Sequence, residues 1–276
     1  MLCALAGLLL LAQPSLELCR VTAGADGGVP AWAKLAPGIE ACAFVLEAEP
    51  ALGDGRLQVV RVDPARAQLE LALAGQHGGK ARTAGEWADA QRFVVTINAG
   101  MYEKDFLTNV GYLRNAAAVN QKGWKSTYQS VLLLGATDAG APAALVDREW
   151  PELKAQLPRY GSVVQNLRLI KGPPASSVWQ PNGKKWSEAL VAQDAQGRLL
   201  FAFSRTPYEM AQLSAMLLAL PLGVVRAMHA EGGPEASLSV RTATLSLDFA
   251  GSFETSFFTD DTNQHQWRIP NVIGAR

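Results

Sequence analysis

The chain has 276 residues, enough for one large domain or two small ones. A hydrophobic fraction of 49% and a charged fraction of 18% are typical of a globular protein with a substantial core. The 25 Lys and Arg residues balance the 25 Asp and Glu residues, so the net charge attracts neither nucleic acid nor an anionic membrane surface. We therefore expect no nucleic-acid partner.

The N-terminus carries an uninterrupted apolar run from Leu2 to Ala12, which is too short to span a bilayer. Its length matches a secretory signal, so we interpret residues 1–23 as a signal peptide, or as an N-terminal hydrophobic segment packed on the domain. The protein is then exported, periplasmic or extracellular, with no transmembrane span after signal removal. Lipoprotein anchoring through Cys19 is less favoured because the bulky Leu18 precedes it. Cys19 and Cys42 could pair in an oxidising compartment.

Residues 24–39 are rich in Ala, Gly and Pro and are predicted to be a linker. It leads into one domain, residues 40–276. Near its start, residues 56–62 and 67–74 alternate apolar and polar side chains on either side of Asp63-Pro64. This pattern favours an antiparallel hairpin.

A helix is predicted next, because Thr83 and Glu86 have the spacing of a capping box. It should end at about Gln91. The following segments are predicted as a strand at 93–97, a strand at 130–134, a helix near 148–156 and a strand at 162–170.

In the last third, Asp194 to Gly197 indicate a turn between strands at 188–192 and 198–203. Thr206, Pro207 and Glu209 are typical of a helix start, and short strands fill residues 224–270. No repeat or second composition regime occurs. The predicted fold class is therefore α+β, a single domain with a strand-dominated mixed sheet core and a few flanking helices.

The stretch from residue 223 to 240 is the most informative part of the chain. An apolar run carries the carboxylate of Glu231 onto a turn that begins with Gly232 and Gly233, and β-like sequence resumes at Ser237. Glycines let a ligand approach the main chain closely, so this turn suits a buried polar ligand such as a sugar phosphate. A plain hairpin turn has the same composition, and both interpretations stay open.

A second candidate site stands at the end of an apolar strand. Asn98, Gly100 and Tyr102 can place an amide and an aromatic ring beside a sugar there. An ordinary Asn/Gly turn after a core strand explains these residues equally well.

Gln165, Asn166 and Arg168 interrupt another β-like run. In a strand, Asn166 and Arg168 share one face and Gln165 points to the other. The guanidinium of Arg168 could bind phosphate. An edge strand with a solvated face is the alternative interpretation.

A fourth candidate combines Lys185, Trp186, Ser187 and Glu188. The indole could stack on a sugar face, Lys185 could meet an anion, and Glu188 would supply a second carboxylate. A solvated loop tethered by one Trp is the alternative.

Cofactor motifs are absent from the sequence, which has no Walker loop, dinucleotide-binding glycine pattern or zinc-ligand spacing. We therefore expect no cofactor and no metal. Of the three histidines, His229 merits attention. It shares a face with Glu231 if the strand stays regular through Ala230.

Five segments in this order resemble the phosphodiester glycosidase domain family. They are Asn98 to Tyr102, Gly111-Tyr112, Val164 to Arg168, Trp186 to Ala189 and Glu231 to Ser237. The resemblance implies an exported hydrolase that cleaves a sugar from a sugar phosphodiester in envelope or extracellular glycans. The expected partner is a carbohydrate or sugar-phosphodiester substrate.

The resemblance also implies roles for the candidate residues. Glu231 stands where the family commonly has Asp and would act as a base or electrostatic stabiliser, with Glu188 as a reserve carboxylate. The N–H groups of Gly232 and Gly233, together with Arg168, would hold the phosphate. The rest of the predicted substrate-binding set is Asn98, Gly100, Tyr102, Gln165, Asn166, Lys185, Trp186, Ser187 and Ser237.

The chain departs from the family at Trp186 to Ala189, where the usual arginine is missing. A non-catalytic envelope module that binds glycan or phosphoglycan is therefore an alternative function. An ordinary glycosidase acting on a neutral glycan is a third possibility. It requires two carboxylates that face each other across one cleft at about 5 to 10 Å.

Overall fold

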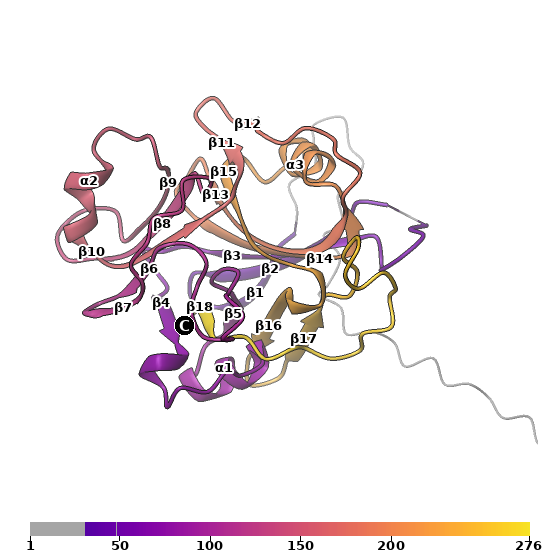
Figure 1. Cartoon of the computed structure of the whole chain (residues 1–276), viewed down its shortest axis with the longest axis horizontal. Helices are drawn as coiled ribbons and strands as arrows, with labels where there is room; N and C mark the ends of the chain where they lie inside the picture. The colour runs from indigo at the N-terminus through magenta and orange to yellow at the C-terminus, as the bar shows by residue number, and fades with distance from the viewer. Residues whose placement is uncertain (1–30, 48) are drawn as a thin grey trace, which may run out of the picture.

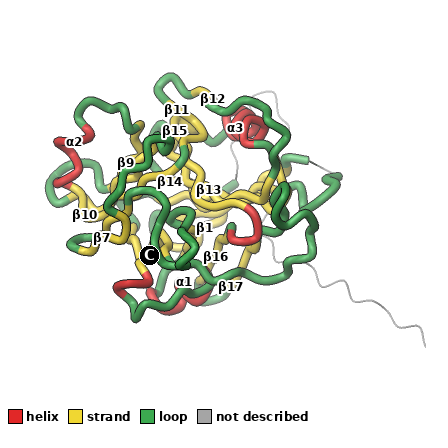
Figure 2. Tube along the Cα trace, in the orientation of Figure 1, coloured by secondary structure: helices red, strands yellow, loops and turns green. Residues whose placement is uncertain are grey.

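Antiparallel sheets form the framework of the computed structural model, which describes residues 31–47 and 49–276 (Figure 1). Strands dominate and the helices are short (Figure 2), so the predicted α+β class is confirmed. The pairings between named strands are all antiparallel, whereas the sequence predicted a mixed sheet. The predicted signal peptide, residues 1–23, lies outside the described residues.

The largest sheet of the described chain has eight strands and carries part of the candidate site. In spatial order they are β1 (Ala33–Ala36), β2 (Ile39–Val45), β3 (Arg56–Val62), β14 (Leu199–Tyr208), β13 (Trp186–Asp194), β15 (Val224–Gly232), β11 (Arg168–Lys171) and β12 (Ser176–Ser177).

Two five-stranded sheets complete the β-structure of the described chain. The first consists of β7 (Ala118–Gln121), β6 (Leu113–Asn115), β10 (Tyr160–Asn166), β8 (Ser130–Ala136) and β9 (Ala143–Asp147). The second consists of β17 (Ser246–Ala250), β16 (Ser237–Arg241), β5 (Val95–Asn98), β18 (Asn271–Ala275) and β4 (Leu69–Leu73).

The α-helices α1 (Ala84–Gln91), α2 (Leu153–Gln156) and α3 (Met210–Ala219) lie at the periphery of the sheets (Figure 1). The described chain also has the 3₁₀ helices η1 (Ala74–Gln76), η2 (Leu157–Arg159) and η3 (Gly233–Glu235). None of the helices in the described chain is long and apolar enough to cross a membrane.

One hydrophobic core joins the three sheets. Val60 of β3, Ile97 of β5 and Leu132 of β8 are fully buried in the same cluster, although each belongs to a different sheet. Burial of apolar side chains contributes roughly 25 cal/mol per Å² removed from water. This shared core fixes the strand ends relative to one another, and the candidate site is built from those ends.

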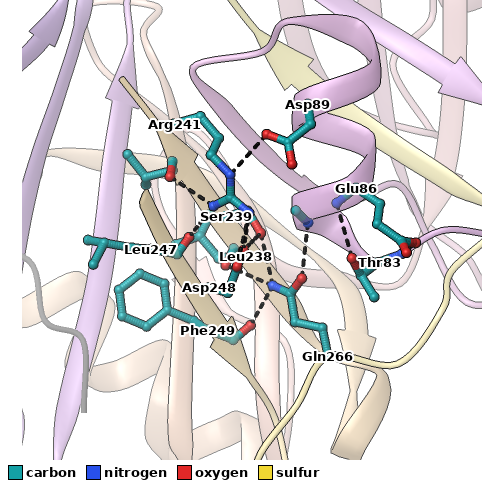
Figure 3. A network of polar contacts seen from close by, with 12 residues as sticks. Thr83, Glu86, Asp89, Leu238, Ser239, Arg241, Leu247, Asp248, Phe249 and Gln266 are labelled. Atoms are coloured by element: carbon teal, nitrogen blue, oxygen red, sulfur yellow. Dashed lines mark hydrogen bonds and ion pairs between the residues drawn. The ribbon is translucent and has the colours of Figure 1, made fainter. Parts of the chain in front are cut away.

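Helix α1 begins as the sequence predicts. The Thr83 hydroxyl accepts a hydrogen bond from the N–H of Glu86, and the Glu86 carboxylate accepts one from the N–H of Thr83, each at 3.0 Å. Gln266 fastens the helix to the sheet beneath it (Figure 3), because its Oε1 accepts from the N–H of Gly85 while its Nε2 donates to the carbonyls of Leu238 and Phe249. The helix is thereby docked on β16 and β17.

The predicted hairpin around Asp63-Pro64 is wrong. Both strands form, but β3 pairs with β2 and β14, whereas β4 pairs with β18 in another sheet. Alternation of apolar and polar residues identifies a strand without identifying its partner. The strand predicted at 162–170 is likewise divided at Leu167 between β10 and β11, which belong to different sheets.

Two predicted boundaries also differ. Helix α3 has Glu209 at its N-cap rather than Thr206, because strand β14 continues through Tyr208. Strand β1 and the first residue of β2 fall within residues 24–39, the segment predicted as a linker. By contrast, the predicted hairpin around Asp194 to Gly197 is confirmed by the pairing of β13 with β14.

Candidate active site

A cavity of about 340 Å³ lies where several strand ends meet. Its walls come from the loop after β5, the junction of β10 and β11, the loop after β12, the start of β13, the end of β15, η3 and the loop after β17. The lining residues are Met101, Tyr102, Val110, Leu167, Trp179, Trp186, His229, Glu231, Gly232, Glu235 and Glu254.

Strand β15 carries two of the polar lining residues, His229 and Glu231. Ala189 of β13 pairs with Glu231 and the next residue, Leu190, pairs with His229, so Ala230 is the extra residue of a β-bulge. The strand is therefore not regular through Ala230, yet both side chains line the cavity. Bulges commonly re-aim side chains beside active sites.

Three carboxyl groups converge on the turn that follows β15. A Cβ atom on Gly233 would lie 2.7 Å from Oε2 of Glu254 and 3.6 Å from Oε2 of Glu235. Gly233 also has a φ of +66°, which disfavours any side chain. The turn must therefore contain glycine here so that Glu235 and Glu254 can approach it beside Glu231.

Burial favours the protonated form of each of these carboxyl groups. It raises the pKa of Glu231, 7% exposed, well above the ordinary value, and the neighbouring charge of Glu235 adds to the effect. Burial raises the pKa of Glu235 to about 7 and also raises the pKa of Glu254. Near neutral pH, Glu235 is therefore present in both protonated and ionised forms. Within the described chain these side chains do not form a set that could hold a metal ion.

The raised pKa of Glu235 predicts that the stability difference between Glu235→Gln and the wild type depends on pH. The folded-state pKa of about 7 exceeds the usual 4.5, so the stability that this group contributes is present below pH 4.5 and lost as the pH rises through 7. After allowance for partial solvent exposure, the loss is about 2 kcal/mol. Urea unfolding of Glu235→Gln and the wild type at pH 4.5 and pH 8 measures it. The variant should gain about 2 kcal/mol relative to the wild type between the two pH values; an unchanged difference would contradict the assignment.

Glu188 lies behind the cavity rather than in its lining. It is fully buried, with Nδ1 of His229 at 2.8 Å from its Oε1 and Nε1 of Trp186 donating to its Oε2 at 2.6 Å. Burial raises the pKa of Glu188, while the contacts with His229 and Trp186 act in the opposite direction. The carboxylate thus fixes the orientation of two rings that do line the cavity.

Aromatic rings form one wall of the cavity. The rings of Trp179 and Trp186 meet edge to face with centroids 6.1 Å apart, and the indole N–H of Trp179 donates to the carbonyl of Arg168. A Cβ atom on Gly232 would come within 2.7 Å of the Trp186 ring, so glycine lets the strand pass close to the indole. Such a wall can stack against the apolar face of a sugar.

Four of the sequence-predicted site residues lie in the lining: Tyr102, Trp186, Glu231 and Gly232. Gly233 lies beside the carboxyl groups of the lining residues Glu235 and Glu254. Burial, with the charges of Glu231 and Glu235, raises the pKa of Tyr102, so its phenol stays protonated and can donate a hydrogen bond.

Asn98 and Ser237 do not reach the cavity but shape it. The Asn98 amide donates to the carbonyl of Glu235 at 3.0 Å and accepts from the N–H of Ser237 at 2.8 Å. Both of these groups of the Asn98 side chain are therefore engaged by the turn that carries Glu235. The predicted contact of Asn98 with a sugar stays a prediction, and in the structure its amide supports the turn beside the cavity.

Gly100, Gln165, Asn166 and Ser187 are also supporting residues. A Cβ atom on Gly100 would lie 3.0 Å from Nδ2 of Asn166, which donates to the carbonyl of Ala99. Gln165 donates to the carbonyls of Lys125 and Tyr128, which anchors a loop. The Ser187 hydroxyl donates to the carbonyl of Arg205.

Arg168 and Lys185 are not in the lining, although the sequence predicted both to meet an anion. Nη1 of Arg168 lies 3.2 Å from Oδ1 of Asp147 and 2.5 Å from Oε1 of Glu149. Its charge is therefore already compensated by two carboxylates. Lys185 is exposed, and its backbone is hydrogen-bonded to Thr255.

Replacement of Arg168 should accordingly leave substrate binding unchanged. Because the guanidinium contacts Asp147 and Glu149 outside the cavity, Arg168→Ala should change the KM of the substrate less than twofold. Loss of a charge-assisted hydrogen bond should still lower the free energy of unfolding by about 2 kcal/mol. Steady-state kinetics and urea unfolding test the two statements. A tenfold rise in KM would return Arg168 to the binding site.

The sequence interpretation missed Glu235, Glu254 and Trp179 as lining residues. Glu235 follows the Glu-Gly-Gly-Pro turn directly, and this spacing was the available signal. Glu254 had none, because its loop is held in place by Arg205, which donates to the carbonyls of Ala250, Asp261 and Asn263. Those contacts join segments far apart in the sequence.

Comparison with known proteins agrees with this architecture. The family model described as phosphodiester glycosidase matches residues 91–276. The catalytic domain of zebrafish N-acetylglucosamine-1-phosphodiester alpha-N-acetylglucosaminidase, auto-inhibited by its pro-peptide, is similar, with a TM-score of 0.56 and 14% identity over 87% of this chain and 83% of that one. A hypothetical protein from Synechocystis has a TM-score of 0.53 and 14% identity over 86% of this chain and 62% of that one.

No curated protein matches the sequence. At such identities the structural likeness shows the fold alone, whereas the family match spans more than half of the chain, including Glu188 and all of β15 and η3. The chain belongs to the phosphodiester glycosidase family.

Proposed function

We propose that this protein hydrolyses the bond between the anomeric carbon of a sugar and a phosphate oxygen in a sugar phosphodiester. Family membership supports the reaction type. The observation that carries the proposal is the convergence of Glu231, Glu235 and Glu254 in one cavity beside an aromatic wall. Glycoside hydrolysis requires a proton donor and a carboxylate on opposite sides of the scissile bond.

The roles follow from the protonation states. Glu231, which burial keeps protonated, gives its proton to the phosphate oxygen as the bond from that oxygen to the anomeric carbon breaks. Water attacks the anomeric carbon, and its proton passes to an ionised carboxylate, Glu235 or Glu254. The products are a free sugar and a phosphomonoester, and the total number of protons is conserved. Glu231 is thus proposed as the acid, whereas the family resemblance implied a base or electrostatic stabiliser.

The sugar would lie against the indole of Trp186, with the phenol of Tyr102 as a hydrogen-bond donor. Glu188 would act through His229 and Trp186 without touching the sugar, because it is fully buried behind both rings.

Phosphorus NMR tests the proposal. The protein would be incubated with a panel of sugar 1-phosphodiesters that differ in the sugar, and the appearance of a phosphomonoester signal would be followed. Release from at least one member is the expected result. Recovery of every member intact, together with measurable binding, would favour the non-catalytic glycan-binding module instead.

A glycosidase acting on a neutral glycan is the second candidate. The acidic lining favours it, because three carboxyl groups face the cavity while the described lining contains no Lys or Arg. Cleavage of a neutral disaccharide in preference to every phosphodiester of the same sugar would support this candidate.

We propose that the protein is exported. The apolar run from Leu2 to Ala12 supports this, because its length matches a secretory signal. Cys19, the partner that the sequence suggests for Cys42, lies outside the described residues. Recovery of the mature chain from the periplasm or medium of an expressing bacterium would test export.

A further inference from the structure

The cavity poses an electrostatic problem for a phosphodiester substrate, whose phosphate always carries a negative charge. Three carboxyl groups line the cavity, and the predicted phosphate ligand Arg168 lies outside it. The N–H of Gly232 donates to Oε1 of Glu231 at 3.2 Å. Among the described lining residues, His229 is the side chain that can carry a positive charge.

The surroundings of His229 fix how its ring is presented. Nδ1 lies 2.8 Å from Oε1 and 2.9 Å from Oε2 of Glu188, which is fully buried. His229 is only 3% exposed, and its ring packs edge to face against Trp186 at a centroid distance of 6.1 Å. Within the described chain, Nε2 has no hydrogen-bond partner, and the ring lines the cavity.

We infer that His229 is the phosphate-contacting residue of the cavity and that Glu188 is its positioning residue. Nδ1–H donates to Glu188, so the second ring nitrogen serves the ligand. When doubly protonated, the ring donates Nε2–H to a phosphate oxygen, and Glu188 balances its charge. His229 and Glu231 stand two residues apart on β15, so both donors can address one phosphate group. This inference rests on the proposed function for its substrate class.

Binding measurements test the inference without turnover. N-acetylglucosamine 1-phosphate and N-acetylglucosamine would be titrated calorimetrically into the wild type, His229→Gln and His265→Gln, whose histidine is exposed. Loss of a charged hydrogen bond should weaken phosphate binding by His229→Gln at least about tenfold. Affinity for the free sugar should change less than twofold, and His265→Gln should match the wild type. Equal phosphate affinity in His229→Gln and the wild type would overturn the inference.

The role of Glu188 is tested by a double-mutant cycle. Glu188→Gln keeps a side chain of the same size but removes the charge. It should weaken phosphate binding about fivefold in the wild-type background and leave it unchanged in the His229→Gln background. A purely structural Glu188 would reduce affinity equally in both backgrounds, and that result would refute its action through His229.

A measurement on the wild type alone covers the case in which a variant fails to fold. The chain has three histidines, so nitrogen NMR of ¹⁵N-histidine-labelled protein can follow each one. N-acetylglucosamine 1-phosphate should shift the His229 ring signals, while free N-acetylglucosamine should not. Equal effects of the two ligands would contradict the inference. Selective phosphate binding without phosphodiester hydrolysis would instead reject the proposed function and leave the inference standing.

Discussion

Replacement of Glu231 by Gln should lower kcat for a sugar 1-phosphodiester by at least about 100-fold while leaving the fold intact. Glutamine occupies nearly the same volume and keeps the hydrogen-bonding atoms, but it cannot transfer a proton. Because burial and the charge of Glu235 raise the pKa of Glu231, this carboxyl group lowers the stability of the folded state at neutral pH. Its replacement by Gln should therefore not reduce stability at that pH. Steady-state kinetics with phosphorus NMR or a coupled phosphatase assay measures the effect.

Glu149→Gln is the matched control for this experiment. Glu149 is a half-exposed carboxylate that contacts Arg168 outside the cavity, so its replacement should leave kcat within twofold of the wild-type value. Circular dichroism and a thermal melt establish that both variants are folded. Wild-type turnover by Glu231→Gln would remove this residue from the reaction.

Replacement of Glu188 by Ala should destabilise the protein by about 3 to 5 kcal/mol. Glu188 is fully buried, accepts a hydrogen bond from Trp186 and is hydrogen-bonded to Nδ1 of His229, so its removal leaves both partners unpaired beside a cavity created in the core. Urea unfolding followed by tryptophan fluorescence measures the loss. The large effect expected here is the reason that the binding cycle uses Gln at this position.

The control for this change is Glu70→Ala. Glu70 pairs with Arg276 at 2.6 Å, but its side chain is 34% exposed. Partly exposed ion pairs of this kind contribute about 1 kcal/mol or less. If Glu188→Ala costs no more than Glu70→Ala, the buried contacts of Glu188 do not hold this part of the structure together.

The sequence was sufficient to predict those elements that are stabilised by contacts between residues close together in the chain. The capping box at Thr83 and the turn at Asp194 to Gly197 each involve residues a few positions apart, and both form as predicted. Helix α3 begins later than predicted because pairing with β13 extends β14 through Tyr208. Here a tertiary contact outweighs a local helix-start signal.

The candidate site could be predicted only in part, because some of its residues are positioned by contacts between distant segments. The motif around Glu231 identifies a carboxylate and its glycine turn from adjacent residues. The position of Glu254, and the engagement of Arg168 by Asp147 and Glu149, depend on segments brought together by the fold. Residue type alone made Arg168 a candidate phosphate ligand, because a guanidinium suits phosphate wherever it is free. The sequence does not reveal that the Arg168 guanidinium is paired with Asp147 and Glu149 in the folded chain.

A crystal structure of Glu231→Gln soaked with an uncleaved sugar 1-phosphodiester is the most direct test of the site. We expect the sugar to lie against Trp186 in the cavity, its anomeric oxygen within hydrogen-bonding distance of residue 231 and a phosphate oxygen near Nε2 of His229. A ligand bound on another face of the molecule, with this cavity unfilled, would contradict the account.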